Sequence, residues 1–564
     1  MNKLFIVLTL FFALPVYADT LQSPSDEKFP EPDAAYNFVR GYLSEMSHGW
    51  EEADGFYVKA LSKDPSSVFL RIQRSYLLVR LGKTDDAIAN IDQLLKELPE
   101  NRAALKFKGD LLWDLKKYPA SIKTYLELDR LQPENADYQF MLSVLYYYNN
   151  EPDKAAALLE KIISRDPAAF KALDLLAAVY IDKKSYDRAL ELLGKALGIN
   201  PDLDAAHFKL GAIAESREDL ESAVKHYEQA LRINPYNSQA RQRLAQVYIR
   251  QKTMGKAVDE LKILSRQKES SPDIHVRMGL LFYEEKQYER AIEEMNTALS
   301  ISPGNPVILY YKALVLEETG RYDEVVSALK QVISREPSNI NAFLHLGYAY
   351  DKMKRYDEAV NTYEELLTFE KEKPEIYMYY ANILIQKKDL KKAEDMLLSA
   401  ISRFSSSDEL HFTLAVVYEK TDRFDDMVRM LRKAIELNPN NSEALNYLGY
   451  SFADKNINLD EADSLIRKAL EFKPDSGYYL DSLGWVYFRQ GKLALALETL
   501  KKALGLVRDD PVLLEHIGDV HQAGGDIDSA LEAWKKALLM DEKEEGLRER
   551  IDKKISDAEK LRKK

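Results

Sequence analysis

Apolar residues recur with helical spacing in pairs of stretches along most of the chain, from residue 34 onward. Each stretch is about 12 to 14 residues long, which is the length of a short amphipathic helix. A polar turn separates the two stretches of a pair, as at 182–185 and 217–219. Proline closes most pairs, as at Pro201 and Pro235, because it cannot continue the second helix. The pattern predicts an all-α protein built from helix–turn–helix units.

Small residues recur with a fixed period inside these pairs. Alanine returns every 34 residues, for example at Ala155, Ala189 and Ala223, and Gly, Ala or Ser precedes it by twelve residues in nearly every unit. Fifteen units fit over residues 34–544 once one inserted residue is placed within 453–460. Small side chains let two helix backbones approach where larger ones would overpack. Because one unit cannot bury its apolar faces alone, we predict a solenoid of about fifteen stacked repeats of 34 residues.

The spacing of these residues resembles that of the tetratricopeptide repeat (TPR) family. Leu210-Gly211, Ala223, Tyr227, Ala230 and Pro235 stand where that family has Leu-Gly, Ala, an aromatic residue, Ala and Pro. The resemblance covers 34–544 and implies a right-handed superhelix with a concave inner surface. The departures are Val325 and Met427 at the alanine position, and Glu269, Lys371, Ser405, Arg508 and Glu542 at the proline position.

The N-terminal segment has the features of an export signal. Lys3 precedes an apolar run over 4–14, and Val16-Tyr17-Ala18 is a small-x-small cleavage site. We predict a signal peptide over 1–18, a flexible linker over 19–33, and residence in the periplasm or cell envelope of a Gram-negative bacterium. An uncleaved membrane anchor is the alternative, although a spanning helix needs about 20 apolar residues.

The C-terminal segment, 545–564, is predicted to be a charged helix that caps the solenoid. Leu547, Ile551, Ile555 and Ala558 lie on one face of it, and charged residues occupy the rest. A basic nucleic-acid-binding tail over 560–564 is the competing interpretation.

Composition argues against most kinds of chemistry. The chain of 564 residues has a formal net charge of −13, which disfavours nucleic-acid binding. It contains no cysteine, which excludes disulfides, thiolate catalysis, cysteine metal sites and a lipid anchor on cysteine. No phosphate-binding loop, zinc-protease motif or nucleophile elbow is present. Three of the histidines, His207, His275 and His411, share one first-helix position, which favours packing. We therefore predict no enzyme, cofactor or metal site; an active site built across repeats is the alternative.

The resemblance implies a protein-binding groove along the first helices. In TPR proteins, positions 2, 5, 9 and 12 of the first helix line the concave surface. The residues carried over to these positions as groove candidates are Tyr283, Tyr310, Tyr348, Met378, Phe412, Tyr450, Trp485 and Phe488. An aromatic groove with scattered acids suits an extended peptide or a helix of a partner protein. The alternative is that about half of these side chains pack against the neighbouring repeat.

The last third resembles a more particular group of proteins. The segments that carry this resemblance are 445–450, 453–462, 480–487 and 515–520. They resemble large TPR proteins of Gram-negative envelopes, some of which are lipoproteins that recruit a carboxy-terminal processing protease. The resemblance implies an exported adaptor that recruits or activates such a protease. An assembly scaffold for polysaccharide export or secretion machinery is the alternative, and self-association remains open.

Overall fold

The computed structural model describes residues 32–267, 271–507, 510–540 and 546–562. The predicted signal peptide and nearly all of the predicted linker lie outside these residues. Pro32 and Asp33, at the end of the predicted linker, already belong to the first helix. The described residues form α-helices and no β-strand, which confirms the predicted all-α fold. None of the described helices has the length and apolar character needed to cross a membrane.

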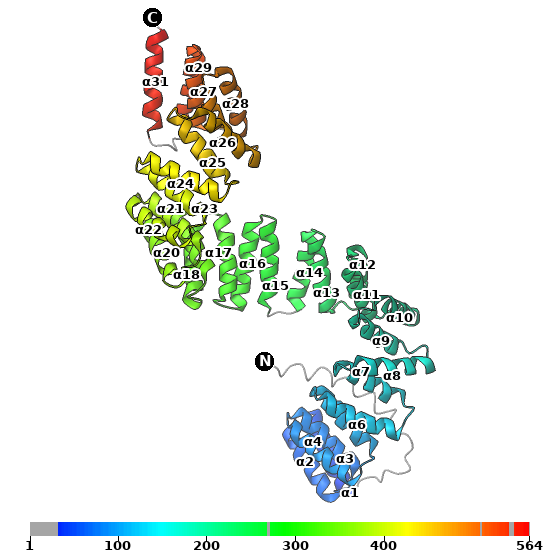
Figure 1. Ribbon diagram of the computed structural model, residues 1–564. Helices are drawn as coiled ribbons and strands as arrows, with labels where there is room; N and C mark the ends of the chain where they lie inside the picture. The colour runs from blue at the N-terminus through cyan, green and yellow to red at the C-terminus, as the bar shows by residue number, and fades with distance from the viewer. Residues whose placement is uncertain (1–31, 268–270, 508–509, 541–545, 563–564) are drawn as a thin grey trace. The chain divides into compact units, whose positions relative to one another are not determined.

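The chain divides into two compact units, Met1–Lys268 and Glu269–Lys564 (Figure 1). The second unit begins at Glu269, one of the positions where the repeat pattern lacks its proline. The first unit contains α1 (Pro32–Met46), α2 (Trp50–Lys63), α3 (Val68–Arg80), α4 (Thr84–Glu97), α5 (Arg102–Asp114), α6 (Tyr118–Leu131), α7 (Ala136–Tyr148), α8 (Pro152–Arg165), α9 (Phe170–Asp182), α10 (Tyr186–Ile199), α11 (Asp204–Ser216), α12 (Leu220–Ile233), α13 (Ser238–Arg250) and α14 (Met254–Gln267).

The second unit continues the same alternation of two helices per repeat. It contains α15 (Pro272–Glu284), α16 (Tyr288–Ile301), α17 (Pro306–Glu318), α18 (Tyr322–Arg335), α19 (Ile340–Lys352), α20 (Tyr356–Phe369), α21 (Pro374–Gln386), α22 (Leu390–Arg403), α23 (Asp408–Lys420), α24 (Phe424–Leu437), α25 (Ser442–Asp454), α26 (Leu459–Phe472), α27 (Gly477–Arg489), α28 (Leu493–Leu506), α29 (Pro511–Ala523), α30 (Ile527–Leu538) and α31 (Leu547–Arg562).

The helix boundaries follow the 34-residue period of the sequence. First helices begin at Arg102, Ala136 and Phe170, each 34 residues after the last. The period lengthens by one residue between α25 and α26, where Asn458 adds a second positive-φ residue to the turn. The inserted residue therefore lies in the turn, within the predicted segment 453–460, and leaves both helices at their usual lengths.

A recurring backbone motif ends each first helix. In the turn after α9, the Ser185 N–H donates to the Tyr180 carbonyl at 2.8 Å, and the Lys184 N–H donates to Ile181 at 2.8 Å. This is the Schellman arrangement, in which one residue takes a left-handed conformation. Lys184 has that conformation, with φ of 56°. The polar turns of the sequence are therefore short, hydrogen-bonded reversals that hold the two helices of a repeat antiparallel.

The periodic small residues lie where two helices touch. Ala223 is fully buried, and a Cβ on Gly211 would lie 2.7 Å from the ring of Tyr227. Gly347 meets Tyr363 in the same way. These contacts confirm that the small residues allow close approach within a repeat.

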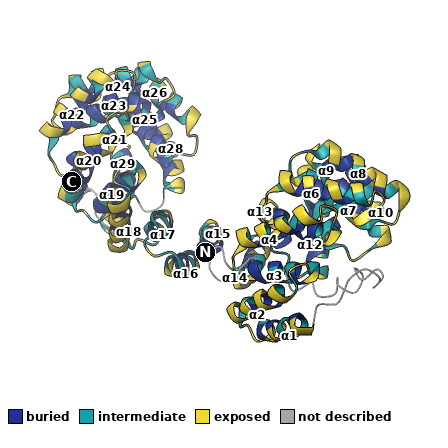
Figure 2. Ribbon diagram, turned by 90° about the horizontal axis from the view of Figure 1, so that it is seen from below, coloured by how far each residue is buried: buried dark blue, intermediate teal, exposed yellow. Residues whose placement is uncertain are grey.

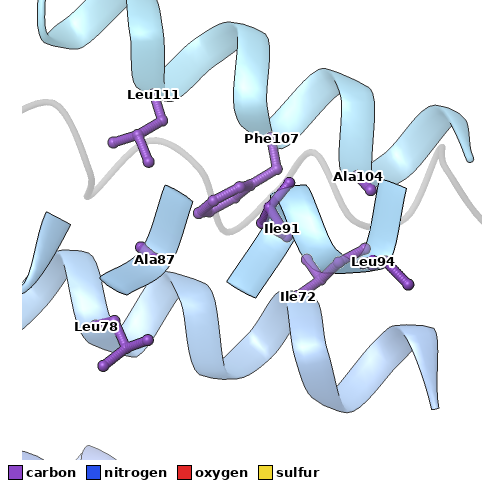
Figure 3. Close-up of a cluster of buried hydrophobic side chains, with 8 residues drawn as sticks. All are labelled: Ile72, Leu78, Ala87, Ile91, Leu94, Ala104, Phe107 and Leu111. Atoms are coloured by element: carbon purple, nitrogen blue, oxygen red, sulfur yellow. The ribbon is translucent and has the colours of Figure 1, made fainter. Parts of the chain in front are cut away.

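The core continues from one repeat to the next within a unit. Figure 3 shows one such cluster, with side chains from three consecutive helices. Its members are Ile72 and Leu78 of α3, Ala87, Ile91 and Leu94 of α4, and Ala104, Phe107 and Leu111 of α5. Each second helix is thus covered on one side by its own first helix and on the other by the first helix of the next repeat.

The last helix, α31, closes the C-terminal end as predicted. Leu547, Ile551 and Ala558 are buried in a cluster that includes Leu514 and Trp534. α31 packs on both α29 and α30. The apolar stripe of α31 therefore covers the last repeat, which confirms the capping helix.

Candidate protein-binding groove

First helices of neighbouring repeats contact one another in each unit. In the first unit α3 contacts α5 and α9 contacts α11; in the second, α21 contacts α23 and α25 contacts α27. The second helices lie farther out: in Figure 2, α22, α24 and α26 lie outside α23 and α25. Several pairs of successive first helices therefore lie side by side on the inner side of each unit, and their unburied faces form the candidate groove.

The eight predicted groove residues lie on the first helices α15 to α27. They differ in how far they face solvent. Tyr348 is the most open, with 43% of its surface exposed, whereas Trp485 is buried with 7% exposed. The half-buried members are Tyr283, Tyr310, Met378, Phe412, Tyr450 and Phe488. Seven of the eight thus retain surface that a partner can reach.

We call the eight predicted groove residues the aromatic stripe. Contacts between adjacent first helices hold its first two members, Tyr283 and Tyr310. The Tyr310 ring packs edge-on against His345 of the next first helix, with centroids 5.6 Å apart. His345 Nδ1 lies 3.0 Å from the Glu317 carboxylate. The Tyr283 hydroxyl donates to Glu318 at 3.4 Å. Each tyrosine is thus held by a residue of the neighbouring repeat.

Two residues beside the stripe were missed by the sequence analysis. His345 contacts Tyr310, and Tyr447 packs edge-on against Phe412 at 5.7 Å between ring centroids. Both occupy position 6 of the first helix, one residue after a predicted lining position. The signal that could have found them is the aromatic or imidazole ring that recurs at position 6 in neighbouring units.

Trp485 forms the floor of the groove at α27. Its ring stacks on His516 of α29, with centroids 4.2 Å apart, and contacts Phe488 at 4.9 Å. The Arg489 guanidinium lies 4.8 Å from the Trp485 centroid on the same helix. The Trp485 indole therefore lies at the base of the groove, and Phe488 is the more accessible aromatic residue of this repeat.

His516 is held in a buried ion pair beneath this stack. Its Nδ1 lies 2.8 Å from Asp481 of the preceding first helix. Burial lowers the pKa of His516, but Asp481, Asp519 and Glu515 together raise it more, so that the net pKa is raised. The aromatic stack is thus anchored by an electrostatic contact between two repeats.

The accessible polar residues around the stripe are mainly acidic. At positions 2, 5, 9 and 12 of α15 to α25 the charged residues are all acidic: Asp273, Glu317, Asp351, Glu375, Glu409, Glu419 and Glu443. Position 13 adds Glu284, Glu318 and Asp454 together with Lys352 and Lys420, and the other basic residues nearby are Arg277 at position 6 of α15 and Arg489 of α27. Burial and Glu318 raise the pKa of Tyr283, and burial and Glu317 raise that of Tyr310. The carboxylates act this way because a phenolate beside them would be repelled. The stripe therefore combines aromatic rings with a negative field.

The described residues offer little that could hold a cofactor. They contain no group of three or more His, Cys, Asp or Glu side chains arranged to hold a metal ion. A cavity of about 200 Å³ lies between α27 and α29, lined by residues that include Tyr478, Asp481 and Leu513. This volume is below the roughly 300 Å³ at which ligand pockets begin. A larger hollow of about 490 Å³, lined by Leu98, Pro99, Glu100 and Asn101, is a shallow depression open to solvent.

Family comparisons match several stretches of the chain to helical repeats. Residues 72–136, and separately 408–441 and 478–510, match families described as tetratricopeptide repeat. Residues 116–276 match the C-terminal ARM domain of tetratricopeptide repeat protein 21, and residues 282–399 match the N-terminal TPR region of Psidin. No curated protein matches the chain at a significant level.

Solved structures with similar folds are distant in sequence. The crystal structure of the APC/C hetero-tetramer Cut9–Hcn1 is 15% identical, covers 81% of this chain and 97% of that chain, and has a TM-score of 0.37. Yeast Tom70 is 16% identical, covers 75% of this chain and 96% of its own, and has a TM-score of 0.38. A tetratricopeptide repeat protein from Parabacteroides merdae ATCC 43184 is 18% identical over 44% of this chain and 97% of its own, with a TM-score of 0.37.

Proposed function

We propose that this chain, whose fold is a TPR solenoid, is a non-catalytic scaffold that binds partner proteins along its first helices. The observation that carries the proposal is the aromatic stripe from Tyr283 to Phe488 together with the carboxylates around it. Aromatic side chains supply large contact area at low entropic cost and dominate the energetics of protein interfaces. The bound segment is an extended strand or a helix of a folded partner.

The charge of the stripe defines the chemistry of the partner segment. Carboxylates such as Glu284, Glu318 and Asp351 attract lysine and arginine side chains and repel acidic ones. Tyrosine rings such as Tyr348 also accept cations on their faces: the Nζ of Lys352 lies 5.0 Å from the centroid of this ring. The favoured ligand is therefore a basic segment with interspersed apolar residues, and its binding weakens as salt rises.

Alanine substitution of the stripe tests this proposal. Tyr310→Ala, Tyr348→Ala and Phe412→Ala remove accessible rings, so that each is expected to weaken partner capture about tenfold. Helical content and the cooperativity of melting should remain, since all three side chains keep solvent-exposed surface. Titration of the purified variants with the recovered partner, followed by calorimetry, measures the loss.

The matched control is Tyr236→Ala. Tyr236 is 82% exposed and lies in the loop between α12 and α13 of the first unit, whereas the stripe belongs to the second unit. Binding that survives the three stripe substitutions, or that Tyr236→Ala weakens equally, contradicts the groove as the binding site.

The proposal extends to an exported adaptor of a carboxy-terminal processing protease in a Gram-negative envelope. The predicted export signal over 1–18 and the resemblance of 445–520 to envelope adaptors support it. A pull-down from envelope extract with the chain from Asp19, followed by mass spectrometry, tests it. Recovery of a processing protease supports the adaptor role. Recovery of export or secretion components without a protease replaces it with an assembly scaffold.

The non-catalytic character has its own test. The purified chain should show no hydrolase turnover in a broad activity screen. Metal-independent turnover that survives further purification would contradict it.

A further inference from the structure

Two histidines face each other between α11 and α12, the two helices of one repeat in the first unit. Nδ1 of His207 lies 3.3 Å from Nδ1 of His226, and the two rings stack with their centroids 5.6 Å apart. Both side chains are half-buried, so that the pair is not sealed from solvent. Neither histidine belongs to the aromatic stripe, and the proposed binding of proteins does not use them.

The same two positions carry a cation or imidazole facing a carboxylate in the next two repeats. The equivalent pairs, 34 and 68 residues further along, are Arg241 with Glu260 and His275 with Glu294. Between α11 and α12 a second imidazole stands in place of the carboxylate. Two nitrogen ligands therefore meet where the neighbouring repeats have an ion pair.

Both imidazoles are held in their neutral form. Burial, His226 and Arg232 lower the pKa of His207. Burial also lowers the pKa of His226, although Asp219 opposes this. The charges of Arg232 and Asp219 likewise act in opposite directions on a cation bound between the rings. A neutral imidazole has a nitrogen lone pair free for a metal ion, whereas a protonated ring has none.

The separation of the two nitrogens matches that of two ligands on a tetrahedral metal ion. Zinc binds histidine nitrogens at about 2.0–2.1 Å, and the tetrahedral angle then places two such nitrogens about 3.3–3.4 Å apart. The observed separation is 3.3 Å. A square-planar ion with similar bond lengths brings neighbouring ligands to about 2.8–3.0 Å. The pair therefore fits a tetrahedral ion that prefers imidazole, which is the chemistry of zinc.

We propose that His207 and His226 bind one Zn²⁺ ion through their Nδ1 atoms, with water in the two remaining positions of the tetrahedron. In the neutral pair, one Nδ1–H donates to the other Nδ1. When the ion binds, this proton moves to Nε2 of its own ring, so that both Nδ1 lone pairs reach the ion and no proton is released. The ion fastens α11 to α12 inside one repeat of the first unit, whereas the aromatic stripe belongs to the second.

Calorimetric titration of the purified chain with zinc chloride, in the absence of a histidine tag, tests the site. A saturable site for one Zn²⁺ per chain is expected, and excess Mg²⁺ should not compete because it prefers oxygen ligands. His207→Gln and His226→Gln each leave one imidazole and should weaken binding about tenfold or more. Gln139 stands at the position equivalent to His207 two repeats earlier, so that the fold accommodates glutamine there.

The matched control is His48→Asn, which removes an imidazole from the same unit. His48 is exposed in the turn after α1, and asparagine tolerates its φ of 63°. This variant should bind zinc as the unsubstituted chain does. The absence of saturable binding, or binding that both glutamine variants retain, overturns the proposal. Binding that His275→Gln abolishes and His207→Gln leaves intact would assign the ion to the next repeat and also overturn it.

Hydrogen exchange followed by mass spectrometry locates the bound ion. Zn²⁺ should slow exchange at the amides of α11 and α12, because a ligand that binds only the folded repeat opposes its local opening. His226→Gln should abolish this protection while circular dichroism shows unchanged helical content. Protection by Zn²⁺ elsewhere in the chain, with none in α11 and α12, overturns the proposal.

Discussion

Each turn between the first and second helix of a repeat contains a residue with positive φ. Glycine supplies it at Gly82, Gly320, Gly491 and Gly525, whereas most other turns use Lys, Asn or Asp. A side chain in this region costs roughly 1–2 kcal/mol, and a hydrogen-bonded Schellman turn imposes it nonetheless. The polar turns were evident from the sequence. Which residue takes the left-handed conformation depends on the two backbone hydrogen bonds of the Schellman motif.

Lys184→Gly is predicted to stabilise the first unit by about 0.5–1 kcal/mol. Lys184 is exposed and has φ of 56°, so that the substitution relieves backbone strain and removes no packing. Urea unfolding monitored by circular dichroism measures the change. Gly320→Ala is the reverse test, because a Cβ there meets no atom within 4 Å and adds only strain. A change in unfolding free energy of the same sign for both substitutions would contradict this explanation.

At the scale of the helix, the cap α31 depends on charges that the sequence analysis did not pair. Lys554 Nζ lies 2.7 Å from Glu515 and 2.6 Å from Asp519, and Arg550 lies 3.0 Å from Glu515. The Glu515 side chain is 5% exposed. Burial raises its pKa, but Arg550 and Lys554 lower it more, so that the net pKa is lowered. The apolar stripe of the cap was visible in the sequence, whereas these pairs join residues 35 to 39 apart, on neighbouring helices.

Lys554→Met is predicted to destabilise the docking of α31 by about 1–3 kcal/mol, because it leaves Asp519 without its cation and Glu515 with Arg550 alone. Hydrogen exchange at the α31 amides, followed by mass spectrometry, measures the local opening. The control is Lys535→Met: Lys535 and Glu559 form an exposed pair at 3.6 Å, and its loss should cost about 0.5 kcal/mol or less.

The pH dependence of the Lys554→Met penalty has a defined sign. A lowered pKa of Glu515 means that its ion pairs stabilise the fold above the usual glutamate pKa and are lost as pH falls through the lowered value. The penalty of Lys554→Met should therefore shrink in acid. An equal penalty at neutral and strongly acidic pH would show that lost packing, and not lost charge pairing, is the cause.

At the scale of the whole molecule, the chain consists of two compact units that repeat the same local contacts. The stability of a solenoid is approximately the sum of the folding free energies of its repeats and of the interaction free energies between neighbouring repeats. Destabilising one repeat therefore also destabilises the repeats beside it. The periodicity of the sequence predicted one uninterrupted series of repeats and gave no sign of a boundary between two units. The missing proline at Glu269 is shared with four other units and is not a specific signal.

Gly211→Ala and Gly347→Ala are predicted to destabilise different units, by about 1–3 kcal/mol each. Their added Cβ atoms would meet the rings of Tyr227 and Tyr363. Hydrogen exchange in urea should show faster opening over residues 32–267 for the first variant and over 271–562 for the second. Gly194→Ala is the control, because its Cβ meets no atom within 4 Å and alanine favours the helix. Equal acceleration along the whole chain would show that the two units unfold together.

The sequence by itself determined the all-α fold, the 34-residue repeat, the position of the inserted residue and the apolar stripe of the cap. It could do so because every repeat packs its two helices in the same way, so that small residues equivalent to Ala223 and Gly211 recur with one period. Only the tertiary structure decided which groove residues are accessible, as the burial of Trp485 and the exposure of Tyr348 illustrate. It also decided that Tyr36 and Leu43 are exposed while Leu70 and Leu77, 34 residues later, are buried. The exposure of a residue depends on whether a neighbouring helix covers it. A periodic sequence has the same pattern in covered and uncovered repeats, so the pattern cannot show which residues are exposed.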